Sequence, residues 1–434
     1  MASGAKRLIV FGGGIASSLL VFNAVDRTFY KKRQIQNSLL ADASLAGKPE
    51  DLHLKQVIIL TRHGARTPFK FIPNYEPATW PVEDNEDLEH TLINHTVRSL
   101  DFGSKPESAI DNAYRDKERL KGGSLVGQLT KIGQEQMYQL GKAYRKRYVE
   151  ELGLLSPDYN HEQVYVRSTN IKRTIMSARC VLAGLYGDTH LKGPIPIFTS
   201  VNEHEVLYPN YYSCKNLKHW AKIAWTTWEN IPGLVEFLDA VAKELGFDRK
   251  KEEFGIISLE DNVCARAAKN EPIPEFLINR RDEIESFAVA YQMRLLIGTG
   301  KSHSIARMAI GAFIEALCTH FEDKAENQSD LRFILYSAHE TTLMAVLHVL
   351  GVYDFKWPKY AADVKLELYQ DENQGWFVKL LYNDKDLTLP GCGTPVCPLS
   401  RFLELCEPYR VKDWYAECGI KGEGVKENVP TGIM

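Results

Sequence analysis

A pattern that recurs three times along the chain constrains the fold most strongly: a short apolar run, a polar tip that carries arginine or histidine, and the start of a helix. The apolar runs occupy residues 55–60, 163–166 and 332–337. Continuous apolar runs of this length are typical of strands buried on both faces of a parallel sheet. Their alternation with helices predicts an α/β fold, in which a mostly parallel sheet has helices on both faces.

The elements that flank these runs can also be read from periodicity. Apolar residues at helical spacing predict helices over residues 130–149, 171–185 and 341–350. Thr341 or Thr342 is the expected N-cap of the last of these helices. Near the end of the chain, residues 363–369 and 376–382 alternate like a pair of antiparallel strands.

The polar tips carry the residue types that phosphate chemistry needs. The candidate residues are Arg62, His63 and Arg66 after the first run, Arg167 after the second, and His339 and Glu340 after the third. Ligands of open α/β sheets bind outside the carboxyl ends of the strands, so we expect the tips to meet there, with His63 facing solvent. Guanidinium groups fit phosphate oxygens, and a neutral imidazole can attack phosphorus. The pattern predicts phosphoryl transfer without a metal ion.

The segment Arg62-His-Gly-Ala-Arg-Thr-Pro68 resembles the signature of the histidine acid phosphatases. The resemblance continues through residues 127–133, 166–174 and 336–342 and covers roughly residues 54–410. It implies a histidine phosphatase-like fold and hydrolysis of a phosphorylated small molecule. It implies neither a cofactor nor a metal ion.

The resemblance also implies a role for each candidate residue. His63 is the nucleophile that becomes phosphohistidine, Arg62, Arg66 and Arg167 hold the phosphate oxygens, and His339 adds a donor. The acidic residue after His339 protonates the leaving group and then activates water. The family usually has aspartate there, whereas this chain has Glu340. One extra methylene moves the carboxyl by roughly an ångström, so a slow or inactive enzyme is a further hypothesis. Glu340 could instead have no catalytic role and only interact favourably with the dipole at the start of the helix.

Shorter blocks point to a substrate class. Residues 120–130, 179–184 and 205–211 are similar to the members of the family that hydrolyse lysophosphatidic acid. The leading hypothesis is therefore a phosphatase acting on a lysophospholipid. The alternatives are a broad-specificity acid phosphatase, an inositol-phosphate phosphatase, and a membrane-tethered lipid-binding protein that has lost turnover. Aromatic residues between 201 and 300 either line a channel for an acyl chain or form a core: Trp220, Trp225, Trp228, Phe237 and Phe254.

Length and charge limit the other functional classes. The chain has 434 residues, enough for two or three domains, with 44% hydrophobic residues. Its 53 basic and 56 acidic residues give a net charge of −3, so no basic excess favours nucleic acid as a partner. We expect an α/β catalytic domain made of residues 54–72, 122–200 and 301–434, and a mostly helical cap made of residues 73–121 and 201–300.

The N-terminal segment has a separate function in this interpretation. Residues 8–25 form an apolar run of 18 residues with basic residues on both sides. This run is a membrane anchor, a cleaved signal or mitochondrial presequence, or a buried helix. We exclude residues 1–50 from the fold. The resemblance implies a mitochondrial location, with possible membrane association through residues 8–25; the alternative is the secretory pathway or a lysosome-like compartment.

The eight cysteines permit as many as four disulfides and contain no CxxC pair that suggests zinc. The resemblance implies a disulfide near Cys392 and Cys397. The alternative is a pair of free thiols in a reducing compartment. Cys180 lies in an apolar helical segment and is expected to be buried.

Overall fold

The computed structural model describes residues 52–75, 78–187, 189, 191–252, 254–298 and 303–420. The predicted anchor or targeting segment at residues 8–25 lies outside them. Within the described ranges, no helix combines the length and the apolarity needed to cross a bilayer.

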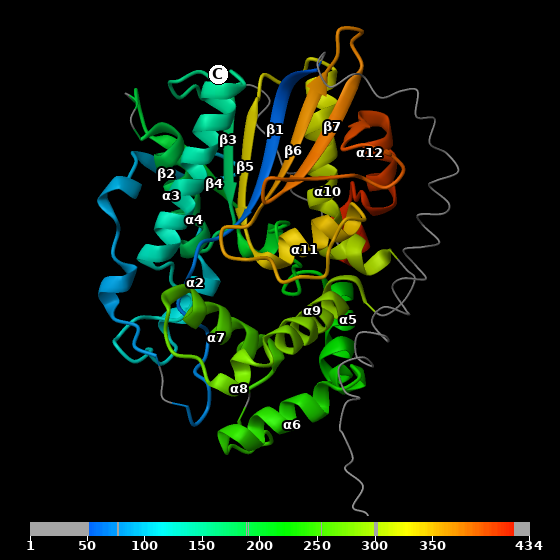
Figure 1. The fold of residues 1–434 in the computed structure, drawn as a ribbon. Coiled ribbons are helices and arrows are strands. Elements are labelled where there is room, and N and C mark those ends of the chain that lie inside the picture. Colours follow the sequence, from blue (N-terminus) through cyan, green and yellow to red (C-terminus); the bar gives the residue numbers. More distant parts are fainter. Residues whose placement is uncertain are drawn as a thin grey trace, which may run out of the picture.

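The centre of the molecule is a single mixed sheet (Figure 1). Its strands are β1 His53–Arg62, β2 His95–Ser99, β3 Val164–Ser168, β4 Ile195–Thr199, β5 Phe333–Ala338, β6 Asp363–Gln370, β7 Trp376–Tyr382, β8 Lys385–Leu387 and β9 Val396–Pro398. They follow the order β2-β4-β3-β5-β1-β6-β7-β8, and β9 also pairs with β7. The pairs from β2 to β1 are parallel, and those of β6, β7, β8 and β9 are antiparallel. The predicted α/β class and mostly parallel sheet are confirmed.

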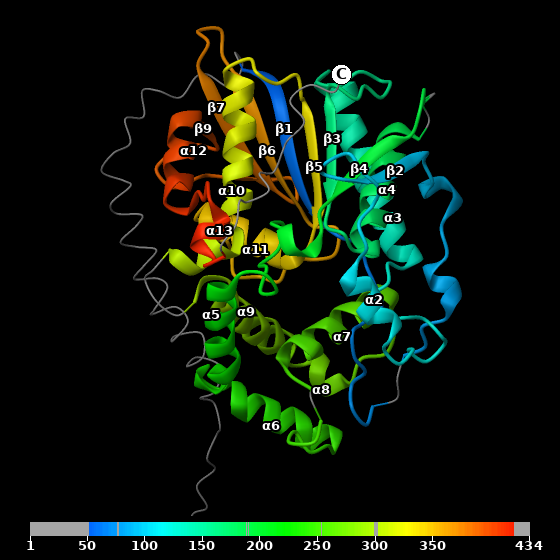
Figure 2. The same ribbon diagram turned by 180° about the vertical axis from the view of Figure 1, so that it is seen from behind.

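Helices cover both faces of the sheet (Figures 1 and 2). Val57 and Ile59 of β1 belong to a core with α3 (Lys131–Tyr144), the π-helical segment Arg145–Glu151 and α4 (Lys172–Tyr186). Ile58 and Leu60 belong to the opposite core with α10 (Ser304–Ala325), α11 (Glu340–Val349) and α12 (Leu399–Cys406). Successive side chains of a strand point to opposite faces, which is why a run with no polar residue is needed here.

Of the two helix N-caps expected from the sequence, one is observed and the other is not. The Thr130 hydroxyl accepts a hydrogen bond from the Gly133 amide and caps α3. The expected N-cap at Thr341 or Thr342 is wrong, because α11 already begins at Glu340 and His339 occupies the cap position. The Thr342 hydroxyl donates instead to the Leu207 carbonyl.

Five helices lie beyond the carboxyl ends of the parallel strands (Figure 1): α5 Lys215–Thr226, α6 Leu234–Leu245, α7 Ile256–Lys269, α8 Glu275–Ile278 and α9 Arg281–Ile297. The segment 73–121, which we expected to belong entirely to the cap, contributes β2 to the sheet as well as the short helix α2 (Ala109–Arg115). Five of its residues therefore belong with the sheet. The division into a catalytic domain and a cap otherwise stays a proposal.

The aromatic residues of this region do not share one environment. Phe237 and Phe254 are buried in the core, whereas Trp220 and Trp225 are each 43% exposed on α5. The core interpretation therefore holds for the two phenylalanines and fails for these two tryptophans.

Two disulfides join the described cysteines. Cys392 is bonded to Cys397, the bridge that the resemblance implied. A second bridge, Cys214–Cys418, links the start of α5 to α13 (Trp414–Glu417) across 204 residues of sequence. The four remaining cysteines are free thiols, and Cys180 is buried as expected.

Candidate active site

The three polar tips meet at one edge of the sheet because β1, β5 and β3 are neighbours. Arg62 at the end of β1 lies opposite Ala338 of β5, and Ser168 of β3 lies opposite Ser337. The His63 amide also donates to the Ala338 carbonyl at 3.1 Å. Residues that are more than 270 positions apart in sequence are thus placed side by side.

Two glycines let the loop after β1 pass against the start of α3. A Cβ added to Gly64 would lie 2.2 Å from the Gly133 carbonyl oxygen, and one added to Gly133 would lie 2.1 Å from that of Ala65. Only glycine permits so close an approach of two backbones. The signature glycine therefore fixes the position of the residues on either side of it.

His63 has the tautomer that a nucleophile requires. Its Nδ1 lies 2.9 Å from the carbonyl oxygen of Gly64, which can only accept, so Nδ1 carries the proton and Nε2 has a free lone pair. The side chain is 1% exposed, so the expectation that it faces solvent is wrong. The ring of Tyr360 lies 5.9 Å from that of His63, and Asp261 of α7 pairs with Arg66 nearby.

The electrostatic surroundings keep this imidazole neutral. Burial lowers the pKa of His63 well below its usual value, and the charges of Arg173, Arg62 and Arg66 lower it further. A protonated imidazole cannot attack phosphorus. The same arginines that suit a phosphate therefore also preserve the nucleophilic form of His63.

Each of the three arginines predicted from the tips has a carboxylate partner. Arg62 Nε lies 3.1 Å from Glu340 Oε2, Arg66 Nη1 lies 2.6 Å from Asp261 Oδ1, and Arg167 Nη2 lies 3.0 Å from Glu205 Oε1. All three guanidinium groups are buried. Charge-assisted hydrogen bonds to ionised partners hold the guanidinium groups in place and offset part of the desolvation cost of burying them.

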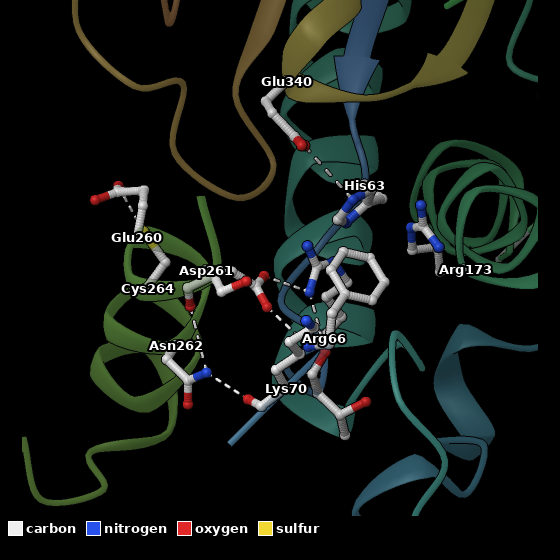
Figure 3. Close-up of polar contacts among 12 residues, drawn as sticks. His63, Arg66, Lys70, Arg173, Glu260, Asp261, Asn262, Cys264 and Glu340 are labelled. Carbon is white, nitrogen blue, oxygen red and sulfur yellow. Dashed lines mark hydrogen bonds and ion pairs between the residues drawn. The ribbon is translucent and has the colours of Figure 1, made fainter. Parts of the chain in front are cut away.

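Glu340 lies close to the candidate nucleophile, His63. Its Oε2 is 3.9 Å from His63 Nε2, and its side chain is 16% exposed (Figure 3). Burial would raise the pKa of Glu340, but the charges of Arg62 and Arg66 outweigh burial and lower it to about 2. Without a bound anion, Glu340 is therefore ionised at all ordinary pH values.

His339 is engaged at both ring nitrogens. Its Nε2 lies 3.1 Å from the Thr169 hydroxyl, and its Nδ1 lies 3.5 Å from Nη2 of Arg173. Burial lowers its pKa to about 3, and the charge of Arg173 adds to this effect. The ring is neutral, with Nδ1 as the acceptor on the side of Arg173.

Several residues around the site were not predicted. Arg173 lies inside the motif 166–174, one position into α4, and its spacing from Arg167 could have pointed to it. Asp261 comes from α7 and accepts from the Phe69 amide as well as pairing with Arg66. The next residue, Asn262, donates to the Lys70 carbonyl (Figure 3). Nothing near residue 261 in the sequence signals these contacts.

No group of three or more His, Cys, Asp or Glu side chains in the described part of the chain is arranged to hold a metal ion. The positive charge at the site comes from guanidinium groups. Such groups can stabilise a transferring phosphoryl group as a metal ion does.

Comparison with known proteins agrees with this geometry. The chain is 38% identical to human lysophosphatidic acid phosphatase type 6 over 374 residues, which cover 85% of this chain and 86% of that one. It is 31% identical to bovine prostatic acid phosphatase over 324 residues, 70% of this chain and 82% of that one.

Solved structures share the fold at low sequence identity. The Hafnia alvei phytase in complex with tartrate matches 86% of this chain and 99% of its own, with a TM-score of 0.58 and 15% identity. The Bifidobacterium longum multiple inositol polyphosphate phosphatase in complex with phosphate matches 86% and 96%, with a TM-score of 0.54 and 12% identity. Residues 53–383 match the histidine phosphatase superfamily (branch 2). The chain belongs to this family, and it is an acid phosphatase.

Proposed function

We propose that this enzyme hydrolyses phosphomonoesters through a phosphohistidine at His63, and that its substrate is lysophosphatidic acid. The observation that carries the proposal is the state of His63. Its Nδ1 is held by the Gly64 carbonyl, its Nε2 is free, and burial together with arginines lowers its pKa. This is a neutral nucleophile beside groups that bind an oxyanion.

In the first step, His63 Nε2 forms a bond to phosphorus while the bond from phosphorus to the leaving oxygen breaks. Arg62, Arg66 and Arg167 donate to the equatorial oxygens, where charge develops. A phosphoryl group on Nε2 needs the space that Glu340 now borders at 3.9 Å. In this proposal the carboxyl of Glu340 lies beside the leaving oxygen once substrate is bound.

Glu340 supplies the proton in this proposal. Its pKa is about 2 because Arg62 and Arg66 lie nearby. A bound phosphate neutralises those charges and adds a like charge, and both effects raise the pKa of the carboxyl. Glu340 then protonates the leaving alkoxide. In the second step it takes a proton from water, the water oxygen bonds to phosphorus, the P–N bond breaks, and inorganic phosphate leaves.

The choice of lysophosphatidic acid rests on similarity along most of the chain. The identity of 38% spans 85% of this chain and 86% of the human protein. The likeness to phytase structures, at 15% identity, extends to the fold alone. A broad-specificity acid phosphatase is the second candidate, because the chain is also 31% identical to prostatic acid phosphatase.

Turnover on three substrates tests the proposal. We expect kcat/KM to be highest for lysophosphatidic acid, lower for an aryl phosphate, and lowest for phytate. Equal values for lysophosphatidic acid and glycerol phosphate would show that the acyl chain is not recognised and would favour the broad-specificity enzyme. Absence of turnover on every substrate would favour the lipid-binding protein without activity.

We propose two alternative locations for the protein: the secretory route and the mitochondrion. The disulfides Cys214–Cys418 and Cys392–Cys397 favour an oxidising compartment, such as that of the secretory route, over a reducing one. Mitochondrial targeting and membrane anchoring both depend on residues 8–25. Fractionation of cells that express the full chain, with and without residues 1–50, separates these alternatives.

A further inference from the structure

Exposed hydrophobic side chains are unevenly distributed over the molecule. Ten large hydrophobic side chains are exposed in the described part of the chain, and four of them lie within residues 212–225: Tyr212, Trp220, Ile223 and Trp225. Of the seven tryptophans of the chain, the two that are exposed both belong to α5. Single exposed apolar residues need no explanation, whereas a local group of them marks an interaction surface.

The exposed side of α5 is also basic. The helix has no acidic residue and three lysines: Lys215, Lys218 and Lys222. All three are exposed, and none of them forms an ion pair with a residue that the structure describes. The next helix, α6, also has twelve residues, but three of them are acidic and only one is a lysine. Unpaired lysines gathered on one surface attract an anionic partner.

The other side of α5 fastens the helix to the rest of the molecule. Leu217, Ala221 and Ala224 are buried at helical spacing and pack against α9 and α10. The Cys214–Cys418 disulfide holds the residue that precedes the helix. Figures 1 and 2 show α5 at the edge of the group of helices beyond the carboxyl ends of the parallel strands. The exposed residues are therefore presented on a rigid support.

Lysines and tryptophans are combined on α5 in a way that suits a lipid surface. At 3.6 residues per turn, the three lysines fall within a sector of about 60°, with Trp225 next to them and Ile223 and Trp220 toward the other side. Tryptophan is enriched where membranes meet water, and lysine lays its apolar stem along such a boundary while its charge reaches the headgroups. Lysine is depleted in protein–protein interfaces, which argues against a protein partner.

We propose that this helix docks the enzyme on the surface of an anionic lipid bilayer. The docking residues, called the α5 face below, are Lys215, Lys218, Trp220, Lys222, Ile223 and Trp225. The lysines lie among the lipid phosphates, and the indole rings enter the headgroup region. The inference rests on the proposed function for what is delivered there, because lysophosphatidic acid is an amphiphile that resides in membranes. It is separate from the apolar run at residues 8–25.

Quenching of tryptophan fluorescence by brominated lipids tests docking without any need for turnover. It reports on the α5 face even if residues 8–25 anchor the full chain. The vesicles contain brominated phosphatidylcholine and about 30% phosphatidylserine, which makes the surface anionic. We expect quenching of the full-length wild type, and loss of most of it in the double variant Trp220→Phe, Trp225→Phe. Trp376→Phe, at a half-buried tryptophan of β7, is the control and should keep the quenching.

Removal of the lysines gives a second readout. The triple variant Lys215→Gln, Lys218→Gln, Lys222→Gln should raise the lipid concentration needed for half of the quenching by about 100-fold, since each lysine contributes about fivefold near an anionic surface. In a chain anchored through residues 8–25, the same change should lower the amplitude of quenching. The matched control removes three exposed charges elsewhere in the cap and should have little effect: Lys243→Gln, Lys250→Gln and Lys251→Gln.

Activity separates docking from catalysis. In the lysine triple variant, kcat/KM should fall for lysophosphatidic acid presented in anionic vesicles and stay unchanged for a soluble aryl phosphate. The second value also shows that the variant is folded. Quenching without hydrolysis of lysophosphatidic acid would refute the proposed function and leave this inference standing, whereas hydrolysis without quenching would do the reverse.

Equal quenching of the wild type and the double tryptophan variant would overturn the proposal. So would equal quenching by vesicles that contain no phosphatidylserine, because the lysines would then have no role. A dimer in solution that the tryptophan substitutions abolish, with no quenching by lipid, would assign the α5 face to a second copy of the chain and would also overturn it.

Discussion

Two clusters of buried charge lie on the same sheet, and they are built differently. The strand-tip cluster consists of the arginines, histidines and carboxylates around His63. The β6 cluster consists of Asp363, Lys365 and Glu367 on β6 together with Tyr144, Arg147, Tyr148 and Tyr369. In both clusters the charged groups on the strands are almost completely buried.

The β6 cluster satisfies its own hydrogen bonds. Glu367 accepts two bonds from Arg147, at 2.7 and 2.9 Å, one from Tyr148 at 2.8 Å and one from Tyr369 at 2.7 Å. Four bonds fill the acceptor capacity of a carboxylate. Lys365 likewise bonds Asp363 and Asp384, each at 2.7 Å.

The strand-tip cluster, in contrast, leaves several of its hydrogen-bond donors without an acceptor. Nε of Arg66 and Nε and Nη1 of Arg173 are buried donors that contact no acceptor within the described residues. Its imidazoles are neutral, so they add no positive charge to that of the arginines. The difference shows how a buried structural network can be distinguished from a binding site: the first is complete without a ligand, and the second is completed by one.

Removal of the nucleophile from the strand-tip cluster should give the largest loss of activity of all the substitutions considered. We expect His63→Ala to lower kcat by about 10⁴- to 10⁶-fold, the scale seen when a nucleophile is deleted. The fold should survive, because the hydrogen bond of His63 Nδ1 goes to the adjacent residue. His95→Ala is the matched control: His95 makes a similar local bond to Ile93, at 2.9 Å, at the sheet edge. Steady-state kinetics in which both variants are equally active would refute the assignment.

Substitution of Glu340 should affect substrates according to their leaving group. Glu340→Gln should slow alkyl phosphates by about 10²- to 10⁴-fold, the usual contribution of general acid catalysis. A nitrophenyl phosphate should be affected far less, because its leaving group needs no proton. Equal slowing of both substrates would remove Glu340 from the mechanism.

The substitution Glu340→Asp tests the role of the same residue in a second way. A large gain in kcat would show that the longer side chain compromises this acid. A loss would show that the site has adapted to glutamate, for example through the contact of Glu340 with Arg62 at 3.1 Å.

Substitutions in the β6 cluster should lower the stability of the protein without lowering its activity. Glu367→Ala leaves Arg147 and two tyrosines without their acceptor, and we expect the free energy of unfolding to fall by about 2–4 kcal/mol. Arg147 is 30% exposed, so water takes over part of its bonding. Chemical denaturation measures the loss, with Glu404→Gln at an exposed pair as the control. A fall in kcat per folded molecule would show that the two clusters are coupled.

The buried histidines predict how stability depends on pH. In the unfolded chain a histidine binds a proton below about pH 6.5, whereas burial lowers the pKa of His320 to about 4 and that of His339 to about 3. The unfolded state therefore binds more protons between pH 6.5 and 4. The free energy of unfolding should fall with acidification by roughly 1.4 kcal/mol per pH unit for each such histidine. His320→Gln should reduce this slope by one proton; an unchanged slope would contradict the assignment.

The sequence predicts the parts of the molecule that depend on local patterns. The strands β1, β3 and β5 and the helices that follow them were found because their apolar runs are long and their tips distinctive. The edge strand β2 was missed because four of its residues are only half-buried and its sequence, His95-Thr-Val-Arg-Ser, has no apolar run. In β4, Pro196 interrupts the pattern expected of a central strand.

The signature residues of the site could be predicted from the sequence, but the carboxylates that pair with them could not. Arg62, His63 and Arg66 lie within one motif, but Asp261 pairs with Arg66 from a helix almost 200 residues later. Glu205, likewise, is the buried partner of Arg167 from a separate loop. Such pairs arise from tertiary packing, and a single sequence carries no periodic signal for them.

A chemical trap of the intermediate tests the central claim most directly. The enzyme is mixed with radiolabelled lysophosphatidic acid or aryl phosphate and quenched in alkali, because phosphohistidine is labile in acid. We predict a labelled protein band in the wild type, absent from His63→Ala, with the label on the peptide that contains His63. Turnover by the wild type without any labelled band, or label on another residue, would contradict the proposed mechanism.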